Sequence, residues 1–330
     1  MYDFSKNFLS SEVTCEEYER CKKLKKRLIK EYKGKKIEDV IEGEVFNTES
    51  GSCYLIEDRA FLRCELIDPV KAKLKILSNF RLIYGIGKLT EVILKEQGYR
   101  TIEDLIGHYR FGEEAKEFLN IVNSCKYNQL INNIEHWFPK SHQLVLFSSS
   151  FFSKEDFIIL DIETLGLSNR PIILIGVAKV TENSIVIKQY LPRDISEESA
   201  ILSGFLSNIS KKNIFITFNG RTFDIPYIQQ RLAYYGMQGN LNMPNYDVLH
   251  FSRRAWREKV DNYKLGTLEK FFFGIERQDD IPSSMVPDFY KAYEKNGNVG
   301  LLLPIISHNK QDLITLANLF SKLHIEWEND

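Results

Sequence analysis

The sequence has no apolar run long enough to cross a membrane, no closely paired cysteines and almost no net charge. Its longest hydrophobic stretches, such as PIILIGVA at 171–178, fall far short of the roughly 20 residues that a transmembrane helix requires. The first residues, MYDFSKNFLSSEV, lack the basic segment followed by an apolar segment that is typical of a secretory signal. We therefore expect a cytoplasmic protein with no membrane partner.

Cysteine usage argues against a disulfide-stabilised protein. The five cysteines are an odd number and include no C-x-x-C pair, and the closest two, Cys15 and Cys21, are further apart than metal-binding pairs usually are. Spacing alone does not exclude four thiolates around one metal ion. We expect reduced structural thiols.

The charge is balanced overall but not locally. Lysine and arginine total 44 against 45 acidic residues, which gives no global sign of a polyanionic partner. Residues 20–36, RCKKLKKRLIKEYKGKK, nevertheless hold ten basic residues and one acid, Glu31. Apolar residues recur through this segment at helical spacing, which predicts an amphipathic helix with a basic face. That face is either simply solvated or a contact surface for phosphates.

At 330 residues the chain is long enough for two or three compact units. We expect the basic helix and a small β unit within 1–77, a helical unit at 78–125, an Asn- and Ser-rich connector at 126–152, and an α/β domain at 153–330. In the last of these, strand-like runs at 157–162, 172–180 and 184–190 predict a three-stranded meander. A helix near 196–209, a strand at 213–218, a helix after Phe223 and a short strand at 245–248 follow.

The helical unit contains a glycine-rich turn. A helix is expected to end before Gly85, the next to run from Lys88 to Gln97, and a third to be capped by Thr101 with Asp104. This pattern resembles a helix-hairpin-helix element, in which backbone N–H groups meet a phosphate. The resemblance implies backbone contacts from Gly85, Gly87 and Lys88, although G-x-G between helices also occurs as a plain tight turn.

Two carboxylates interrupt the apolar segment FIILDIETLGL at 157–167. Side chains alternate along a strand, so Asp161 and Glu163 point to the same face. Two anions held together near a core are costly unless water reaches them, a proton neutralises one, or a cation lies between them.

Acids stand beside apolar structure at two further places. In TFNGRTFDIPYI (217–228), Asp224 opens a helix, and in ISHNKQDLITLANLF (306–320), His308 and Asp312 share one helical face. Each has an ordinary explanation alone, such as a helix cap or a surface pair. Together, four carboxylates and a histidine from a strand end, a strand-to-helix junction and a late helix indicate a two-metal hydrolase, because hard divalent cations prefer oxygen ligands.

The three motifs DIET, NGRTFDIPYI and H-x-x-x-D resemble those of the DEDD (DnaQ-like) 3'-5' exonucleases, which have the ribonuclease H-like fold. The stretches YDVLHFSRRAW, LGTLEKFFFGIERQDDIP and HNKQDLITLANL are similar to the YprB-like branch, which includes a bacterial mitomycin-repair exonuclease linked to a partner helicase. The resemblance covers about 155–320. The four-residue step from His308 to Asp312 departs from the commonest histidine-type members and matches the tyrosine-type enzymes, but YprB-like sequences share it.

This resemblance implies an α/β fold with a mixed sheet flanked by helices, and an exonuclease that releases nucleoside 5'-monophosphates. Two Mg²⁺ or Mn²⁺ ions would be held by Asp161, Glu163, Asp224 and Asp312, with Asp161 bridging both and His308 as the general base. The last nucleotide would be bound by Thr164, Leu165, Gly166, Asn219 and Phe223.

The implied substrate is nucleic acid, with a single-stranded DNA or a 3' end favoured, and a helicase is the implied partner. Two alternatives stay open: an RNA exonuclease, because the sequence does not separate DNA from RNA, and an adaptor that binds nucleic acid without turnover. We expect Asp247 to be structural, paired with Arg253 or Arg254.

Overall fold

The computed structural model describes residues 14–328. The N-terminal stretch that was considered for a secretory signal, residues 1–13, lies outside the described residues. Among the helices that are described, none combines the length and the apolar character needed to span a bilayer. All five cysteines are free, and three of them, Cys21, Cys53 and Cys64, are buried.

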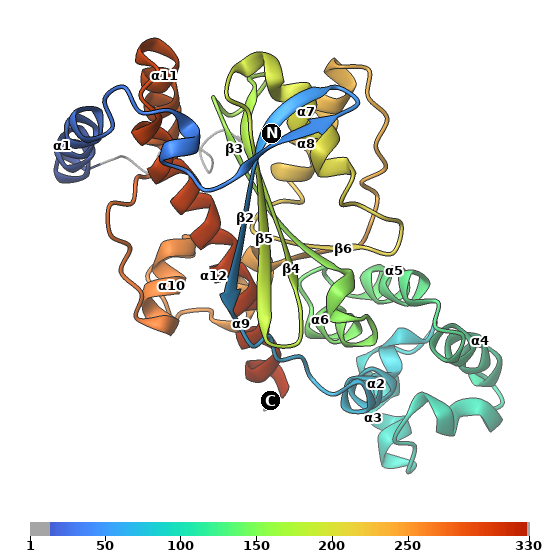
Figure 1. The fold of residues 1–330 in the computed structure, drawn as a ribbon. Coiled ribbons are helices and arrows are strands. Elements are labelled where there is room, and N and C mark those ends of the chain that lie inside the picture. The colour runs from blue at the N-terminus through green and yellow to red at the C-terminus, as the bar shows by residue number, and fades with distance from the viewer. Residues whose placement is uncertain (1–13, 329–330) are drawn as a thin grey trace, which may run out of the picture.

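A single mixed sheet organises the described chain (Figure 1). Its strands lie in the order β1-β2-β5-β4-β3-β6-β7. All neighbours are antiparallel except β3–β6 and β6–β7, which are parallel. The strands are β1 (Glu44–Thr48), β2 (Gly51–Phe61), β3 (Phe157–Thr164), β4 (Ile172–Val180), β5 (Ser184–Leu191), β6 (Ile214–Thr217) and β7 (Asn245–Asp247). The predicted α/β class and the predicted meander, now β3-β4-β5, are confirmed.

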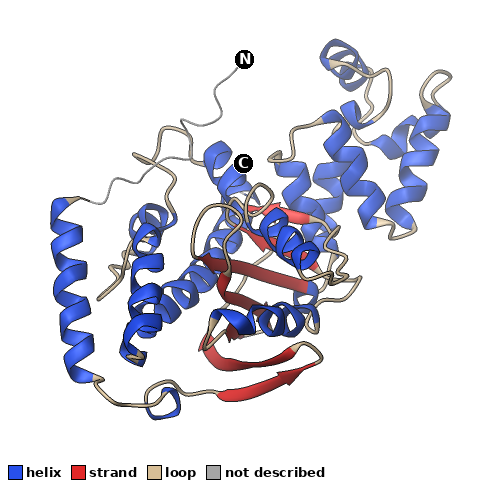
Figure 2. Cartoon of the chain, turned by 90° about the horizontal axis from the view of Figure 1, so that it is seen from above, coloured by secondary structure: helices blue, strands red, loops and turns tan. Residues whose placement is uncertain are grey.

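Helices cover both faces of this sheet, and a group of helices extends to one side of it (Figure 2). The α-helices are α1 (Cys15–Glu31), α2 (Pro69–Leu77), α3 (Lys88–Glu96), α4 (Gly112–Asn123), α5 (Tyr127–Trp137), α6 (Gln143–Ser148), α7 (Glu198–Leu206), α8 (Asp224–Tyr234), α9 (Val248–Ala255), α10 (Leu265–Phe273), α11 (Val286–Asn296) and α12 (Leu303–Glu328). The lateral group is α2 to α5.

Strand β3 lies between two apolar layers. Phe157 and Ile159 pack in the same cluster as residues of α12, whereas Ile158 and Leu160 pack in the cluster that holds residues of α7 and α8. All four side chains are at most 1% exposed. The alternation continues past Leu160, so the odd-numbered residues that follow point toward α12.

The predicted N-terminal β unit is not a separate unit. Its two strands, β1 and β2, form a hairpin, and β2 pairs with β5 along most of its length, from Tyr54 opposite Leu191 to Phe61 opposite Ser184. The grouping of these strands with residues 1–77 was therefore wrong. The alternating pattern identified the strands, but β5 would otherwise be an unpaired edge, and no local pattern shows which edge a strand will join.

The predicted connector at 126–152 is also wrong, because it folds into α5 and α6. Leu130, Ile131 and Ile134 form a buried helical stripe among the asparagines of α5. The apolar residues of α6 belong to the same core cluster as Phe157. Helix α5 packs against α6, and α6 packs in the core beside the sheet, so the lateral helices are joined to the sheet through α6.

The turn chemistry predicted for the lateral helices is present. Helix α3 begins at Lys88 as expected, and Gly85 adopts a left-handed conformation with φ +81°. The N–H of Thr101 donates to Asp104 Oδ2 at 2.8 Å, ahead of a short 3₁₀ helix, Ile102–Gly107. These contacts define the turn, and its function as a helix-hairpin-helix element stays a prediction.

A buried ion pair joins α7 to α8 and holds the start of β4. Glu198 and Arg231 are 0% and 4% exposed and make two contacts, of 2.6 and 2.7 Å. Glu198 also accepts hydrogen bonds from the N–H of Ile172 at 2.8 Å and the hydroxyl of Tyr235 at 3.0 Å. Removing this carboxylate leaves a buried guanidinium unpaired.

We predict that Glu198→Ala lowers the free energy of unfolding by about 3–5 kcal/mol, as expected for breaking a buried pair. Urea unfolding followed by circular dichroism measures this change. Glu113→Ala is the control, because Glu113 pairs with Lys116 on the surface, and its loss should cost less than about 1 kcal/mol. Equal costs for both variants would contradict the prediction.

Candidate active site

The end of β3 places two carboxylates on the face that α12 covers. Asp161 lies opposite Gly176 of β4, and Glu163, which is 6% exposed, lies opposite Leu174. The pairing shifts register between Glu163 and Thr164, where the strand ends. Asp161 and Glu163 therefore lie on the same side of the sheet, as the alternation of side chains along a strand predicts.

The third predicted acid enters from the junction of β6 and α8. Asp224 is the first residue of α8, and its Oδ1 accepts a hydrogen bond from the N–H of Ile162 at 3.2 Å. The turn before it is fixed by the buried Asp247, which accepts from the N–H of Asn219 at 2.8 Å and of Arg221 at 3.3 Å. Asp247 is structural, as expected, but its partners are these backbone groups rather than Arg253 or Arg254.

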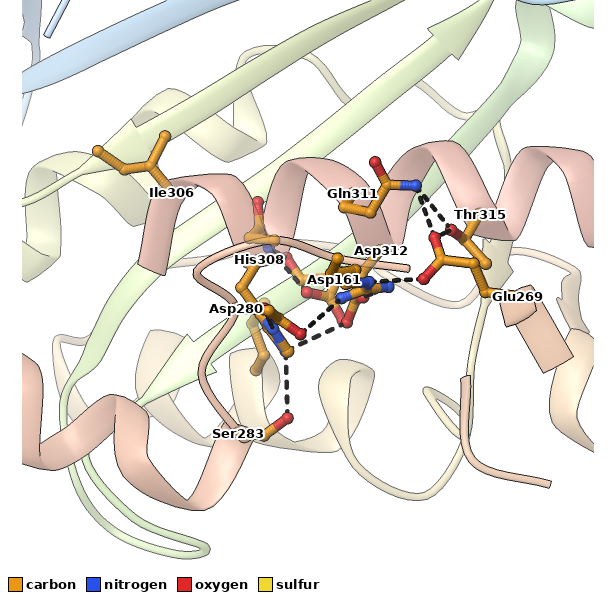
Figure 3. Close-up of polar contacts among 12 residues, drawn as sticks. Asp161, Glu269, Asp280, Ser283, Ile306, His308, Gln311, Asp312 and Thr315 are labelled. Atoms are coloured by element: carbon orange, nitrogen blue, oxygen red, sulfur yellow. Dashed lines mark hydrogen bonds and ion pairs between the residues drawn. The ribbon is translucent and has the colours of Figure 1, made fainter. Parts of the chain in front are cut away.

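His308 and Asp312 lie one turn apart on α12 and face the same space (Figure 3). His308 Nε2 is 3.6 Å from Asp312 Oδ2. Its Nδ1 lies 2.7 Å from Asp280 Oδ1, and the hydroxyl of Ser283 lies 3.2 Å from Nε2. The histidine is thus held between the helix and the loop that precedes α11.

That loop also supplies a cation. Arg277 Nη2 lies 2.6 Å from Asp312 Oδ1, and Arg277 Nε donates to Glu269 Oε2 at 2.6 Å. Glu269 is itself buried and accepts hydrogen bonds from Gln311 and Thr315 of α12. Arg277 therefore partly neutralises Asp312, although the contact lacks hydrogen-bond geometry.

A chain of buried amides holds Asp161. Asn309 Nδ2 donates to Asp161 Oδ2 at 2.8 Å and to the Asp161 carbonyl at 3.1 Å. Gln189 of β5 in turn donates to Asn309 Oδ1 at 2.8 Å. Asn309 and Gln189 are both 0% exposed, so these bonds fix the orientation of the carboxylate.

The carboxyl groups share an excess of negative charge. Burial, together with the charges of Asp312 and Glu163, raises the pKa of Asp161 well above its ordinary value. Burial likewise raises the pKa of Glu163 to about 8, and burial with the charge of Asp247 raises that of Asp224 to about 7. The dehydrated acids repel one another, as expected for groups gathered in one site.

His308 balances part of this charge. Burial alone would lower its pKa, but the charge of Asp312 and the hydrogen bond with Asp280 raise it to about 10. The pKa of Asp280 is lowered, because the hydrogen bond and charge of His308 outweigh its burial. His308 is consequently a cation at neutral pH in this arrangement.

The donor set fits divalent cations. The side chains form no ready group of three or more His, Cys, Asp or Glu around one point within residues 14–328, and Arg277 and Asn309 already contact two of the acids. Nevertheless, carboxylate oxygens are the ligands that Mg²⁺ and Mn²⁺ prefer, and the raised pKa values show a charge that cations would offset. Asp161, Glu163, Asp224 and Asp312 are the residues that would hold them.

Comparison with known proteins gives the family. Residues 158–324, half of the chain, match the model of the RNase_H superfamily. The chain belongs to the RNase H superfamily. It is also 32% identical over 185 residues to the uncharacterized protein YprB of Bacillus subtilis strain 168, a match that covers 54% of this chain and 44% of that protein. The match thus spans less than half of the relative's length.

Membership of the RNase H superfamily indicates the general type of reaction and the class of substrate. Its proteins are generally nucleases, usually with divalent metals, so nucleic acid is the expected substrate class of this site. Asp161, Glu163, Asp224, His308 and Asp312 all lie within the matched residues.

The predicted substrate-binding residues of the RNase H domain lie in the two segments that adjoin Glu163 and Asp224 along the chain. Thr164 is the last residue of β3, Leu165 and Gly166 begin the loop after it, and all three are partly exposed. Thr164 Oγ1 donates to the Gly166 carbonyl at 2.8 Å. Asn219, with φ +64°, and Phe223 lie in the turn before Asp224. Their contacts with a nucleotide stay a prediction.

Tyr227 is buried and holds the loop after β3. Its hydroxyl lies 2.9 Å from the carbonyls of Gly166 and Arg170 and accepts from the N–H of Arg170 at 3.2 Å. It therefore fixes both ends of the loop after β3. Gly85, Gly87 and Lys88, in contrast, lie in the lateral helices and not among these residues.

Sequence reasoning missed Arg277, Asp280, Ser283, Glu269 and Asn309. The first three lie in an irregular segment, where no periodicity predicts which side chains turn inward. Asn309 could have been predicted from its position next to His308 in the helix that also carries Asp312. Glu269 lies among the apolar residues of α10, and no pattern in that helix marks it as part of a site.

Gly176 is the position that lets α12 approach β4. A Cβ atom there would lie 2.1 Å from Asn309 Oδ1, the amide that positions Asp161. We predict that Gly176→Ala lowers the free energy of unfolding by about 1–3 kcal/mol through overpacking, measured by urea unfolding.

The matched control for Gly176→Ala is Gly266→Ala. Gly266 lies in α10, and a Cβ atom there would have no heavy atom within 4 Å outside its own helix turn, so alanine should be neutral or stabilising by up to about 1 kcal/mol. A neutral Gly176→Ala would show that α12 does not depend on this close approach.

Proposed function

We propose that the protein is a two-metal-dependent 3'-5' exonuclease that hydrolyses nucleic acid to nucleoside 5'-monophosphates, with DNA favoured. The observation that supports this best is that β3, α8 and α12 bring Glu163, Asp224, His308 and Asp312 near enough to Asp161 for the charge of each to act on it, all within the RNase H superfamily domain. The motifs DIET, NGRTFDIPYI and H-x-x-x-D support the DEDD type.

In this proposal the four acids bind divalent cations, and His308 removes a proton from the attacking water. Asp161, Glu163, Asp224 and Asp312 would hold the cations, whose positive charge would polarise the scissile phosphodiester and offset the negative charge of the acids. With the charge of Asp312 offset in this way, His308 would lose one of the two main causes that raise its pKa. His308 Nε2 accepts the proton of the attacking water while Asp280 holds Nδ1–H. The water oxygen bonds to phosphorus as the bond from phosphorus to the 3'-oxygen breaks, and the 3'-oxygen takes a proton from solvent.

The loop after β3 completes the proposed site. Thr164, Leu165 and Gly166 bind the last nucleotide against Asn219 and Phe223, and Tyr227 keeps this loop in place through its bonds to Gly166 and Arg170. A site that binds the terminal nucleotide of a nucleic-acid strand is consistent with an exonuclease. The 3'-5' direction and the use of Mg²⁺ or Mn²⁺ are proposed from the resemblance to the DEDD enzymes.

The proposal extends to the lateral helices and to cellular context. Gly85, Gly87 and Lys88 are proposed to contact backbone phosphates, because Gly87 caps α3 without a side chain over the first N–H groups. The enzyme would act in cytoplasmic DNA repair or processing with a helicase partner. A silent nucleic-acid-binding adaptor is disfavoured because all four acids and His308 are present.

We predict that Asp161→Asn lowers nuclease activity at least about 10³-fold, because this carboxylate is central to the acid group. The assay uses end-labelled single-stranded, duplex and overhanging DNA and RNA with Mg²⁺, Mn²⁺ or chelator. Release of labelled mononucleotide from the 3' end is the expected result.

The control is Asp156→Asn, since Asp156 precedes β3 and lies outside the site. Full activity in Asp161→Asn would eliminate the two-metal proposal. Cuts within a circular substrate would indicate an endonuclease instead.

We also predict that Asp280→Ala lowers kcat by about 10²-fold with little change in KM, because the Asp280 carboxylate orients His308 from 2.7 Å away. In the His308→Gln background the same change should have almost no further effect. Glu276→Gln is the control, since Glu276 pairs with Lys270 on the surface. Independent, additive losses would show that Asp280 acts on something other than His308.

A further inference from the structure

Helix α1 is fixed against the RNase H superfamily domain. Cys21, Leu24 and Leu28 are buried in one cluster with Met285 and Phe289, and α1 lies beside α11 in Figure 1. The Lys25 ammonium donates to the Asp288 carbonyl at 3.1 Å and lies 4.7 Å from the centre of the Phe289 ring. The apolar stripe predicted from the sequence is therefore the docking face.

Docking this stripe leaves the basic face in solvent. The exposed basic residues of the segment are Arg20, Lys22, Lys23, Lys26, Arg27, Lys30, Lys33, Lys35 and Lys36. Within residues 14–328, Lys23, Lys26 and Lys30 form no ion pair. A rigid face with unbalanced positive charge is suited to a polyanion.

This face adjoins the loop that holds His308. Arg27 pairs with Asp279 at 2.6 Å, and Arg20 Nη2 lies 3.5 Å from the Asp280 carbonyl. The carboxylate of the same Asp280 contacts His308. Helix α1 is thus linked to His308, the proposed general base, through the adjacent residues Asp279 and Asp280.

A groove of about 490 Å³ lies between α1 and this loop, lined by Glu16, Glu19, Arg20, Lys23, Leu24, Arg27 and Asp279. Two of its acids have basic partners, since Asp279 pairs with Arg27 and Glu19 lies 3.5 Å from Lys22. Arg20 and Lys23 remain on the α1 wall, with Lys26 and Lys30 further along the helix. The balance of charge along α1 is positive.

We propose that the exposed basic face of α1 binds the backbone phosphates of the nucleic-acid strand whose end enters the active site. The inference rests on the proposed nuclease function. The contacts are independent of base sequence, because lysines act on phosphates as point charges. The face supplies positive charge for the strand in addition to that of Arg277 and His308, which pair with acids of the site.

The test compares Lys23→Gln/Lys26→Gln with Lys211→Gln/Lys212→Gln. Both double variants remove two exposed lysines, and glutamine has a helix propensity close to that of lysine. Lys211 and Lys212 precede β6, at the opposite end of that strand from Asp224. Anisotropy of a labelled single-stranded 20-mer is measured in EDTA across a salt series, so binding is read without turnover.

The α1 pair should reduce the slope of log affinity against log salt by about 1.4 and weaken binding on the order of 25-fold at 0.1 M salt, whereas the control pair changes neither. Equal effects of both pairs, or no effect of the α1 pair, would overturn the proposal. So would unchanged oligonucleotide binding together with lost binding to anionic phospholipid vesicles, which would assign the face to a membrane.

A kinetic measurement separates this inference from the proposed function. If the nuclease proposal holds, the α1 pair should raise KM for the 20-mer about 10-fold or more with kcat unchanged, because the acids and His308 are untouched. A protein with no nuclease activity but the expected salt slopes would refute the proposed chemistry and keep the binding face. Normal kinetics and normal salt slopes would refute the binding face alone.

Discussion

Mutual repulsion among buried carboxyl groups is the constraint on which the rest of the site depends. Burial raises the pKa of Asp161, Glu163 and Asp224, and the charges of neighbouring acids raise it further. Such a group is stable only if protons or cations offset its charge. Arg277 and the charged His308 supply part of that compensation from within the chain.

The surrounding structure keeps these acids together despite their repulsion. Asn309 holds Asp161 and is itself held by Gln189, so the orientation of one carboxylate depends on β5 as well as α12. Gly176 makes this possible, because any larger residue would meet the Asn309 amide. The acids are therefore placed by a rigid sheet and a long helix, which favours defined ligand geometry over adaptability.

Much of this could be predicted from local patterns. Asp161 and Glu163 share a face because strands alternate, and His308 and Asp312 do so because helices repeat every 3.6 residues. Asp280 and Arg277 had no such signal, since they belong to an irregular loop whose contacts are long-range. The same limit applies to β2, whose pattern identified a strand but not its partner β5, and to α5, whose asparagines obscured the stripe of Leu130, Ile131 and Ile134.

The net charge is close to zero, but acidic and basic residues are concentrated in different parts of the molecule. Acids are concentrated where cations would bind, and bases are concentrated on α1, outside the sheet. A phosphodiester is itself an anion, so an acid-rich site attracts it poorly until cations are present. Positive charge close to the site but separate from the metal ligands resolves this conflict. Contacts from Arg20 and Arg27 to the loop that holds His308 keep that charge at a fixed place beside the acids.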